Sequence, residues 1–564
     1  MKKILIANRG EIAIRIIRAC RDAGYVSVAV ASDADRLAMH ARTADETQIL
    51  PGTSPADTYL NHNAILAAAT RAGADAIHPG YGFLSENDEF AAAVEAAGLI
   101  WIGPSSEAIR VLGDKVAARA IARSVGVPLL PSLETARLDT EMAQGFIDEH
   151  GLPVIIKAQN GGGGRGMRIV REISELSSQL DAAAREANLA FGRSQCFVER
   201  YLEHARHIET QCLADAHGNV AVLSTRDCTL QRRQQKLVEE APAPFISKSL
   251  AEQLTLASTA ILKQASYRGA ATCEFLLAGN GELYFLEVNT RVQVEHPVTE
   301  EVTGIDIICE MFKIAEGEVV ALDLAPISRH AIELRINAED PWAGFRPVPG
   351  KIERLRLPGG PGVRLDFGYE EGDTLPPNYD SLVGKLIVTG RDRQQALARA
   401  RRALAELQVE GIKTLAPLFE KILSSPAYSA SAPADFTVHT RWVDEQIDSL
   451  AALAQATADR PTAKAIPLPA QDMSPAALAG TNTVAPVAES APLYRDGIKA
   501  PLSGLILELC VSQGDKVEVG QLVAIMESMK MEQSIHAEVA GVVSAINVQI
   551  GSFIEMDADI LGVD

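Results

Sequence analysis

Residues 526–532 read Met-Glu-Ser-Met-Lys-Met-Glu, and the chain on either side of them repeats itself. The shift that lays Ala500 on Ala537 also relates Gly504 and Gly541, Leu509 and Ile546, Val511 and Val548, Gly514 and Gly551, Val517 and Ile554, and Val523 and Ile560. Valine- and isoleucine-rich segments on both sides have strand character. Two similar halves predict a small pseudo-symmetric β-sandwich, with Lys530 on the turn that joins them.

Length and composition limit the class of protein to which the chain can belong. Its 564 residues predict roughly four domain-sized units, and an apolar fraction of 47% supports large cores. A net charge of −20 argues against non-specific binding to nucleic acid or anionic membranes. Ile4–Ala7 is too short for a signal peptide, and no apolar run is long enough to cross a bilayer. Seven cysteines without a C-x-x-C pair indicate neither a zinc site nor a disulfide framework. We therefore expect a cytoplasmic protein.

The N-terminal region alternates strands and helices. Lys3–Ala7, Val26–Ala31 and Ala74–His78 have the pattern of buried strands, and an apolar helix face follows the first of them. This alternation predicts a parallel sheet of the doubly wound kind. The turn after the first strand reads Asn-Arg-Gly-Glu, so the G-x-G-x-x-G fingerprint of a dinucleotide site is missing.

Two features are suited to binding phosphate groups. The four glycines Gly161–Gly164 join two expected strands, so they form a hairpin and not the strand–glycine–helix order of a P-loop. Glycine backbone can approach and cover a phosphate, and Lys157 before the run could supply a positive charge. The basic run Asp227–Lys236 would usually be a solvated face, but in this acidic chain it could equally surround an anion.

The region with most chemistry is Glu274–Glu300. Gly279–Gly281 predicts a hairpin turn, and its two arms bring Glu274 and Glu287 close together. An extended second arm would place alternate residues on one polar face: Glu287, Asn289, Arg291, Gln293 and Glu295. Two carboxylates and an amide oxygen are hard ligands that suit Mg²⁺ carrying a nucleotide, whereas without a cation the carboxylates would repel.

After Trp442 the composition changes. Asp444–Glu489 is rich in alanine, proline and threonine and lacks a strand pattern, which predicts a linker. About 50 residues of such chain span up to ~150 Å as extended polyproline helix or ~40 Å as a coil.

These motifs together resemble a known family. Residues 1–441 resemble biotin carboxylase, an ATP-grasp enzyme, and 497–564 resemble its biotin carboxyl carrier domain. In that domain the lysine between two methionines is biotinylated, whereas the related lipoyl domain usually lacks those methionines. The whole chain is similar to the α subunit of bacterial acyl-CoA carboxylases of the acetyl/propionyl-CoA type.

The resemblance implies a mixed architecture of α/β and α+β domains followed by an all-β sandwich. It implies these segments: 1–114, the doubly wound N-terminal domain; 115–330, the ATP-grasp domain with its glycine-rich lid; 331–442, the C-terminal carboxylase domain; 443–496, a flexible linker; and 497–564, the biotinyl domain.

The resemblance also implies a role for each matching residue. The ATP site comprises Lys115, Lys157, Gly162, Gly163, Gly164, Gly166, Glu199, Tyr201, Leu202, His207 and Gln231. The ligands of Mg²⁺ or Mn²⁺ are Glu274, Glu287 and Asn289. The bicarbonate site comprises Arg291, Gln293 and Val294. The catalytic set is Arg291, Glu295, Arg335 and Lys236, and Lys530 carries biotin.

The reaction that the resemblance implies has two steps. Bicarbonate, deprotonated by Glu295, attacks the γ-phosphate of Mg-ATP, and the resulting carboxyphosphate breaks down to CO₂ and phosphate. Phosphate then removes a biotin proton so that the ring captures CO₂, while Arg335 steadies the biotin enolate. This sequence departs from the family at Asn160, where the glycines usually start, and at Gln234, where histidine or an aromatic residue is common. Both departures bear on nucleotide affinity.

Two other classes fit only part of the chain. An ATP-grasp ligase joining an acid to an amine leaves Lys530 unexplained, and a lipoyl carrier leaves the ATP site unexplained. The expected partners are a separate carboxyltransferase β subunit, biotin protein ligase and a second copy of the carboxylase part. Acyl-CoA is the expected acceptor, with pyruvate and urea as alternatives.

Overall fold

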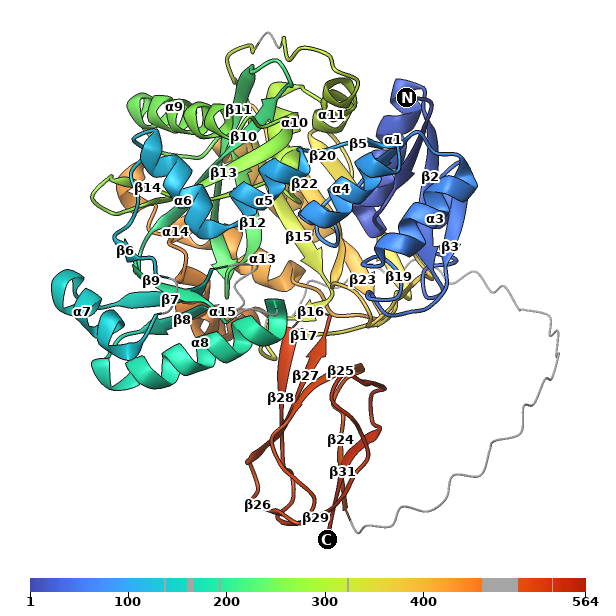
Figure 1. Ribbon diagram of the computed structural model, residues 1–564, viewed down its shortest axis with the longest axis vertical. Coiled ribbons are helices and arrows are strands. Elements are labelled where there is room, and N and C mark those ends of the chain that lie inside the picture. Colours follow the sequence, from blue (N-terminus) through green and yellow to red (C-terminus); the bar gives the residue numbers. More distant parts are fainter. Residues whose placement is uncertain (136–137, 160–166, 192–193, 322–323, 459–495, 530) are drawn as a thin grey trace, which may run out of the picture. The chain divides into compact units, whose positions relative to one another are not determined.

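The computed structural model describes the chain from Met1 to Asp564 except residues 136–137, 160–166, 192–193, 322–323, 459–495 and 530 (Figure 1). The chain divides into two compact units, Met1–Pro376 with Ser381–Leu450, and Pro377–Asp380 with Ala451–Asp564. Within the described residues, no helix combines the length and apolar character needed to cross a membrane.

The N-terminal part is a five-stranded sheet in the order β3-β2-β1-β4-β5 with all neighbours parallel. Its strands are β1 (Lys3–Ile6), β2 (Val26–Ser32), β3 (Glu46–Leu50), β4 (Ala76–His78) and β5 (Ile100–Trp101). Its helices are α1 (Gly10–Ala23), α2 (Met39–Thr43), α3 (His62–Ala72), α4 (Asp88–Ala96) and α5 (Ser106–Gly113). Helix α1 buries its apolar face and ends at Gly24, whose left-handed φ of 80° allows its N–H to reach the last carbonyls. The doubly wound prediction is confirmed.

An antiparallel sheet of eight strands forms the centre of the first unit, in the order β14-β13-β10-β11-β12-β15-β22-β20 (Figure 1). Its strands are β10 (Arg206–Ala214), β11 (Val220–Arg232), β12 (Gln235–Ala241), β13 (Gly269–Leu277), β14 (Leu283–Asn289), β15 (His330–Asn337), β20 (Val363–Phe367) and β22 (Leu382–Gly390). Strands β12 and β15 pair from Val238/Leu334 to Ala241/Ala331, so the sheet continues across the domain boundary expected at residue 331. The helices of this part are α6 (Lys115–Ser124), α9 (Lys248–Gln264), α10 (His296–Thr303), α11 (Ile307–Ala315), α12 (Arg393–Glu406), α13 (Ala416–Ser424), α14 (Pro426–Ser429) and α15 (Trp442–Ala458).

A smaller sheet with the order β6-β9-β7-β8 carries the expected glycine hairpin. Its elements are β6 (Ser132–Leu133), α7 (Thr140–His150), β7 (Val154–Ala158), β8 (Met167–Val170), α8 (Leu176–Phe191) and β9 (Cys196–Arg200), with a short 3-10 helix at Ile173–Glu175. Strands β7 and β8 are antiparallel, which confirms the hairpin. The predicted lid residues Gly162, Gly163, Gly164 and Gly166, and Asn160, lie outside the described residues.

Short paired strands complete the first unit: β16 (Glu339–Asp340) with β17 (Arg346–Pro347), β18 (Gly350–Lys351) with β21 (Thr374–Leu375), and β19 (Arg354–Arg356) with β23 (Gln408–Glu410). A 3-10 helix spans Pro433–Asp435. In chain order, β16–β19 lie between β15 and β20, β21 lies between β20 and β22, and β23 lies between α12 and α13.

The C-terminal part consists of two four-stranded sheets, ordered β24-β31-β29-β26 and β28-β27-β25-β30. The strands are β24 (Asp496–Lys499), β25 (Gly504–Leu509), β26 (Lys516–Val517), β27 (Leu522–Ser528), β28 (Met531–His536), β29 (Gly541–Ile546), β30 (Phe553–Ile554) and β31 (Asp559–Val563). The shift that lays Ala500 on Ala537 also lays β24 on β28, β25 on β29, β26 on β30 and β27 on β31. When each strand is replaced by its equivalent, the order of the first sheet becomes the order of the second. The predicted pseudo-symmetric sandwich is confirmed. Ser528 pairs with Met531, and Lys530 itself lies outside the described residues.

The linker predicted for residues 443–496 begins earlier than the structure allows. Residues 443–458 belong to α15, and the first compact unit continues to Leu450. Val443 and Leu450 are buried and lie seven positions apart, which is the spacing of one helix face. The alanine-rich composition that suggested a linker also favours a helix once that face finds a core. The prediction of a flexible linker is therefore wrong for residues 443–450.

Candidate active site

A row of charged residues crosses four neighbouring strands of the central sheet. Glu287 on β14 pairs with Glu274 on β13, Glu274 pairs with Glu209 on β10, and Glu209 pairs with Arg226 on β11. Residues directly opposite one another in a sheet point to the same face. The predicted approach of Glu274 and Glu287 is confirmed, and the register adds Glu209 and Arg226, which sequence reasoning missed.

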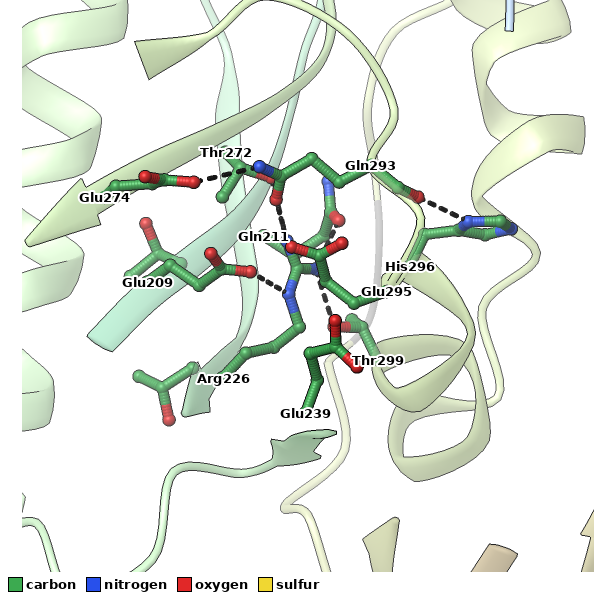
Figure 2. A network of polar contacts seen from close by, with 12 residues as sticks. Glu209, Gln211, Arg226, Glu239, Thr272, Glu274, Gln293, Glu295, His296 and Thr299 are labelled. Carbon is green, nitrogen blue, oxygen red and sulfur yellow. Dashed lines mark hydrogen bonds and ion pairs between the residues drawn. The ribbon is translucent and has the colours of Figure 1, made fainter. Parts of the chain in front are cut away.

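Arg226 organises the interior of this site (Figure 2). Its side chain is fully buried, and each of its five N–H groups has an acceptor. The acceptors are Glu209, Gln211 (2.5 Å), Thr299 (3.2 Å), Thr272 (2.8 Å) and Gln293 (2.9 Å). The planar guanidinium thereby fixes the amide of Gln293, a predicted bicarbonate residue, and Gln293 Nε2 in turn donates to Glu274 at 3.0 Å. The signal that could have identified it is an arginine in the middle of a long strand that begins with the apolar run Val220–Leu223.

Lys236 stands at the centre of three carboxylates. Its Nζ lies 2.7 Å from Glu209, 2.8 Å from Glu274 and 2.6 Å from Glu295. Burial alone would lower the pKa of Lys236, but the three carboxylates outweigh burial and raise that pKa well above its usual value. Lys236 is therefore an ammonium ion held in place by the site. Of the basic run Asp227–Lys236, the last residue contacts the carboxylates of this site, and whether the run surrounds a bound anion stays a prediction.

Glu295 and Arg335 form the other side of the cluster. Arg335 Nη2 donates to Glu295 at 2.9 Å, and Arg335 Nε donates to Glu239 at 2.6 Å. Burial would raise the pKa of Glu295, yet Lys236 and Arg335 lower it below the usual value of a glutamate. Glu239 behaves differently, because burial raises its pKa to about 7 despite Arg335. Glu295 is thus the ionised carboxylate of this pair.

The segment from Thr290 to Glu295 departs from the expected extended strand. β14 ends at Asn289, and α10 begins at His296 with Pro297 in its first turn. Gln293 O accepts from His296 N at 3.2 Å and lies 2.8 Å from His296 Nδ1, the contact drawn in Figure 2, so the chain is already turning there. The predicted continuous polar face is therefore wrong, because the helix start folds the chain back. Arg291 bonds Glu86 at 2.9 Å and Asn289 Oδ1 at 3.1 Å, whereas Gln293 and Glu295 face the buried cluster.

The predicted metal ligands come together. Asn289 Nδ2 donates to Glu274 at 2.9 Å, Glu274 pairs with Glu287 across the strands, and Lys115 Nζ lies 3.6 Å from Glu287. Two carboxylates and an amide at one end of a hairpin are a donor set that fits Mg²⁺, which takes few protein ligands and completes its shell with phosphate and water.

The predicted nucleotide residues separate into two groups. His207 Nδ1 and Gln231 Nε2 are 2.9 Å apart, and His207 Nε2 lies 3.1 Å from Glu274. Burial would lower the pKa of His207, but the Glu274 carboxylate raises it. On the smaller sheet, the buried Lys157 and Glu199 form an ion pair, and Arg119 also binds Glu199. Tyr201 and Leu202, half-buried, follow directly after β9.

A second buried lysine supports the predicted bicarbonate residue Val294. Lys385 Nζ donates to Val294 O at 2.7 Å and lies 3.1 Å from Glu11, and Tyr81 donates its hydroxyl to the same Glu11 carboxylate. Lys385 is fully buried, and sequence reasoning missed it together with Glu11. The segments that carry Glu11, Tyr81 and Lys385 are distant in the sequence, and they thus meet next to residues 293–295.

Comparisons with known proteins agree with this site. Residues 1–109 match the family described as biotin carboxylase, N-terminal domain, residues 114–322 the carbamoyl-phosphate synthase L chain ATP binding domain, residues 333–445 the biotin carboxylase C-terminal domain, and residues 496–562 the biotin-requiring enzyme domain. The Mycobacterium leprae biotin-dependent acyl-coenzyme A carboxylase alpha3 subunit is 46% identical over 98% of this chain and 97% of its own length. A pyruvate carboxylase subunit of Methanothermobacter thermautotrophicus is 46% identical over 78% of this chain and 89% of its own.

A solved structure, the biotin carboxylase domain of Hydrogenobacter thermophilus 2-oxoglutarate carboxylase with Mg-ADP and bicarbonate, is 42% identical, covers 80% of this chain and 98% of its own, and has a TM-score of 0.76. Fold and site thus define an ATP-dependent, biotin-dependent carboxylase. The chain belongs to the biotin carboxylase family as an α subunit with its own biotinyl domain, and an α subunit implies a carboxyltransferase partner. The expected cofactors, biotin, ATP and Mg²⁺, agree with these matches.

Proposed function

We propose that this chain carboxylates a biotin on its own Lys530, using ATP and bicarbonate, as the first half-reaction of an acetyl- or propionyl-CoA carboxylase. A separate β subunit then transfers the carboxyl group to the acyl-CoA. The observation that carries the first half is the contact of Lys236 with Glu209, Glu274 and Glu295, beside Arg335, in a chain that also contains a biotinyl fold.

One end of the site handles the phosphates. Glu274, Glu287 and Asn289 would hold Mg²⁺, which neutralises phosphate charge when bound. Lys115, beside Glu287, and Lys236 supply fixed cations nearby. A phosphate that approaches Lys236 competes with the three carboxylates for its ammonium group. Binding of ATP would then loosen the ion pair between Lys236 and Glu295. Lys157 must likewise leave Glu199 before it can contact a phosphate.

The other end activates bicarbonate. Glu295 is the general base, and its basicity rises once Lys236 turns toward a phosphate. Gln293, held by Arg226, and Val294, held by Lys385, orient the substrate, and Arg291 supplies positive charge. Arg335 remains beside Glu295, where negative charge develops during the reaction, and a preorganised cation is most effective at such a place.

Biotin on Lys530 supplies the ring nitrogen that accepts the carboxyl group. Biotin protein ligase would attach it, and residues 459–495 would form the linker between the catalytic unit and the biotinyl domain. We also propose that the carboxylase part forms a homodimer, that the protein acts in the cytoplasm, and that the domain boundaries at 114/115, 330/331 and 442/443 follow the family, with the first unit extended by α15.

The acyl-CoA acceptor is supported by the Mycobacterium leprae relative, which matches the biotinyl domain as well as the catalytic part. Pyruvate remains a second candidate because of the pyruvate carboxylase relative, which matches over 78% of the chain. Urea remains a third acceptor that fits the same half-reaction. Residues 459–495 are too few to hold a carboxyltransferase domain between the carboxylase and the biotinyl domain, which supports a separate partner that binds the acceptor.

The test uses the biotinylated full chain with ATP, Mg²⁺ and labelled bicarbonate, with acetyl-CoA, propionyl-CoA, pyruvate or urea, and with or without a candidate β subunit. We expect label on the protein alone, and its discharge to malonyl- or methylmalonyl-CoA only when the β subunit is present. A labelled acyl-CoA product from the chain alone would refute the split into two subunits. Discharge to pyruvate or urea would assign the other acceptor.

A further inference from the structure

We propose that His204, His439 and Glu445 form a binding site for a divalent first-row transition ion, best suited to Zn²⁺ and distinct from the Mg²⁺ ligands of the active site. His204 lies in the connection between β9 and β10. His439 precedes α15, and Glu445 lies in the first turn of that helix. The site therefore joins two segments that are more than 230 positions apart in the chain, as the neighbouring Glu203–Arg441 pair with a separation of 238 shows.

The geometry suits one ion held by three ligands. His204 Nε2 lies 3.9 Å from Glu445 Oε1, and His439 Nε2 lies 3.5 Å from Glu445 Oε2. One ligand atom from each of the three side chains lies within 4.8 Å of the others. Zinc–ligand bonds of about 2.0–2.1 Å place tetrahedral ligand atoms roughly 3.3 Å apart, so small side-chain rotations would close the site around an ion.

The two imidazoles are arranged as neighbouring ligands. Their ring centroids are 4.3 Å apart with an angle of 43° between the planes. Among the described residues, His439 Nδ1 is buried and has no hydrogen-bond partner. The Nε2 atoms of both rings face the Glu445 carboxylate, so one ion there could bind both imidazoles.

The surrounding charges leave Glu445 available. Arg441 Nη2 lies 3.5 Å from Glu445, but Arg441 Nη1 lies 3.1 Å from Glu203. Glu445 can therefore turn to an ion without leaving the guanidinium unpaired. The side chain of His204 is 66% exposed, so the ion can enter from solvent and keep a water as its fourth ligand. Two nitrogen donors and one carboxylate favour Zn²⁺, Ni²⁺, Co²⁺ or Cu²⁺ over Mg²⁺, which prefers oxygen ligands.

Ion binding would stiffen a connection that already exists in the backbone. Thr440 N donates to Ala205 O at 3.0 Å and Arg441 Nη1 donates to Glu203 at 3.1 Å, so the segment that carries His204 is already bonded to the residues just before α15. An ion at His204, His439 and Glu445 adds a further fixed point next to them. Tyr201 and Leu202, proposed for the nucleotide pocket, precede His204 by only a few residues. Occupancy is therefore expected to limit movement of the loop that leads to that pocket.

The experiment titrates the biotinylated full chain with Co²⁺ in the presence of excess Mg²⁺ and ADP, which occupy the active-site ligands. Visible absorption reports histidine-bound Co²⁺, and metal analysis after dialysis gives the stoichiometry. We expect one ion that Zn²⁺ displaces and Mg²⁺ does not. His204→Ala and Glu445→Gln should each weaken its binding at least roughly tenfold, because even supporting residues of metal sites contribute that much.

The matched control is His217→Ala, which removes another exposed histidine outside the cluster and should leave the affinity unchanged. Circular dichroism checks that each variant is folded, which is expected because His204 is exposed. Equal Co²⁺ binding by the wild-type chain and His204→Ala would overturn the proposal. Displacement of the ion by Mg²⁺ would overturn it as well, because the ion would then occupy the carboxylate site.

Discussion

Lys236 Nζ lies 2.6 Å from Glu295 Oε1, although the two residues are 59 positions apart in the chain. The same ammonium also contacts Glu209 and Glu274, which lie on the side of the site proposed for Mg²⁺. One lysine thus joins the proposed base to the proposed metal ligands. Because a cation beside Glu295 lowers its basicity, we propose that the base becomes effective when Lys236 turns to another anion, the phosphates of ATP.

Glu287→Gln and Glu295→Gln should separate the two ends of the site. Glu287→Gln removes a hard anionic ligand and should weaken the use of Mg-ATP. Glu295→Gln should preserve nucleotide binding and lower bicarbonate-dependent ATP cleavage by about 10²–10⁴-fold, the usual cost of losing a general base. Calorimetry with Mg-ADP and steady-state kinetics measure the two effects. Equal loss of nucleotide binding in both variants would contradict this division of roles.

Lys530→Arg should retain positive charge but abolish biotinylation, because guanidinium is a poor nucleophile. An avidin blot should lose its signal, while ATP cleavage that depends on bicarbonate and free biotin persists. Lys516→Arg changes an exposed lysine on β26 of the same domain; it is the matched control and should remain biotinylated. Loss of the ATP cleavage in a folded Lys530→Arg chain would show that carrier and catalyst are not separable.

Lys385→Met should destabilise the first unit and weaken bicarbonate use. The change leaves Glu11 buried without its lysine, and breaking a buried ion pair costs about 3–5 kcal/mol of the free energy of unfolding. It also removes the donor to Val294 O, so the KM for bicarbonate should rise more than kcat falls. Urea unfolding and initial-rate kinetics measure both effects.

Two further variants test the reason for the Lys385 effect. The double change Glu11→Gln with Lys385→Met removes the unpaired charge and should recover part of the lost stability. Lys351→Met removes an exposed lysine on β18 and should be close to neutral. If the double variant were less stable than Lys385→Met alone, the unpaired Glu11 would not be the cause.

His40 should make the N-terminal domain sensitive to acid. Burial lowers the pKa of His40 to about 4, and the nearby Arg9 charge adds to the lowering. His40 Nδ1 accepts from Gly10 N, so a proton on that nitrogen would also break this hydrogen bond. A histidine with a lowered folded-state pKa contributes stability that is present above its unfolded pKa of about 6.5 and is lost as the pH falls toward 4.

His40→Gln tests this pH dependence, because glutamine offers one acceptor and one donor and does not titrate. Urea unfolding at several values between pH 7.5 and pH 4.5 should show the wild-type chain losing about 2–3 kcal/mol more stability than the variant. Parallel pH dependences for the two chains would contradict a titrating His40.

Several features followed from the sequence alone because they are local. The repeat around Met526–Glu532 predicted the two matching sheets, since equivalent residues at a constant shift build equivalent strands. The turn at Gly279–Gly281 brought Glu274 opposite Glu287, because a hairpin sets its own register. The glycine run between two strands predicted the β7–β8 hairpin for the same reason.

Only the tertiary structure decided the interior of the site. Glu209 on β10 pairs with Glu274 on β13, and Arg226 bonds Thr272 and Gln293. These contacts close over long sequence separations, so no local pattern identifies the partners. The start of α10 turned Gln293 and Glu295 inward, and the burial of Val443 and Leu450 made a helix of an expected linker. The periodicity of the sequence determines on which face of its own helix or strand a residue lies. Tertiary packing determines which charged residues from distant segments are buried next to one another.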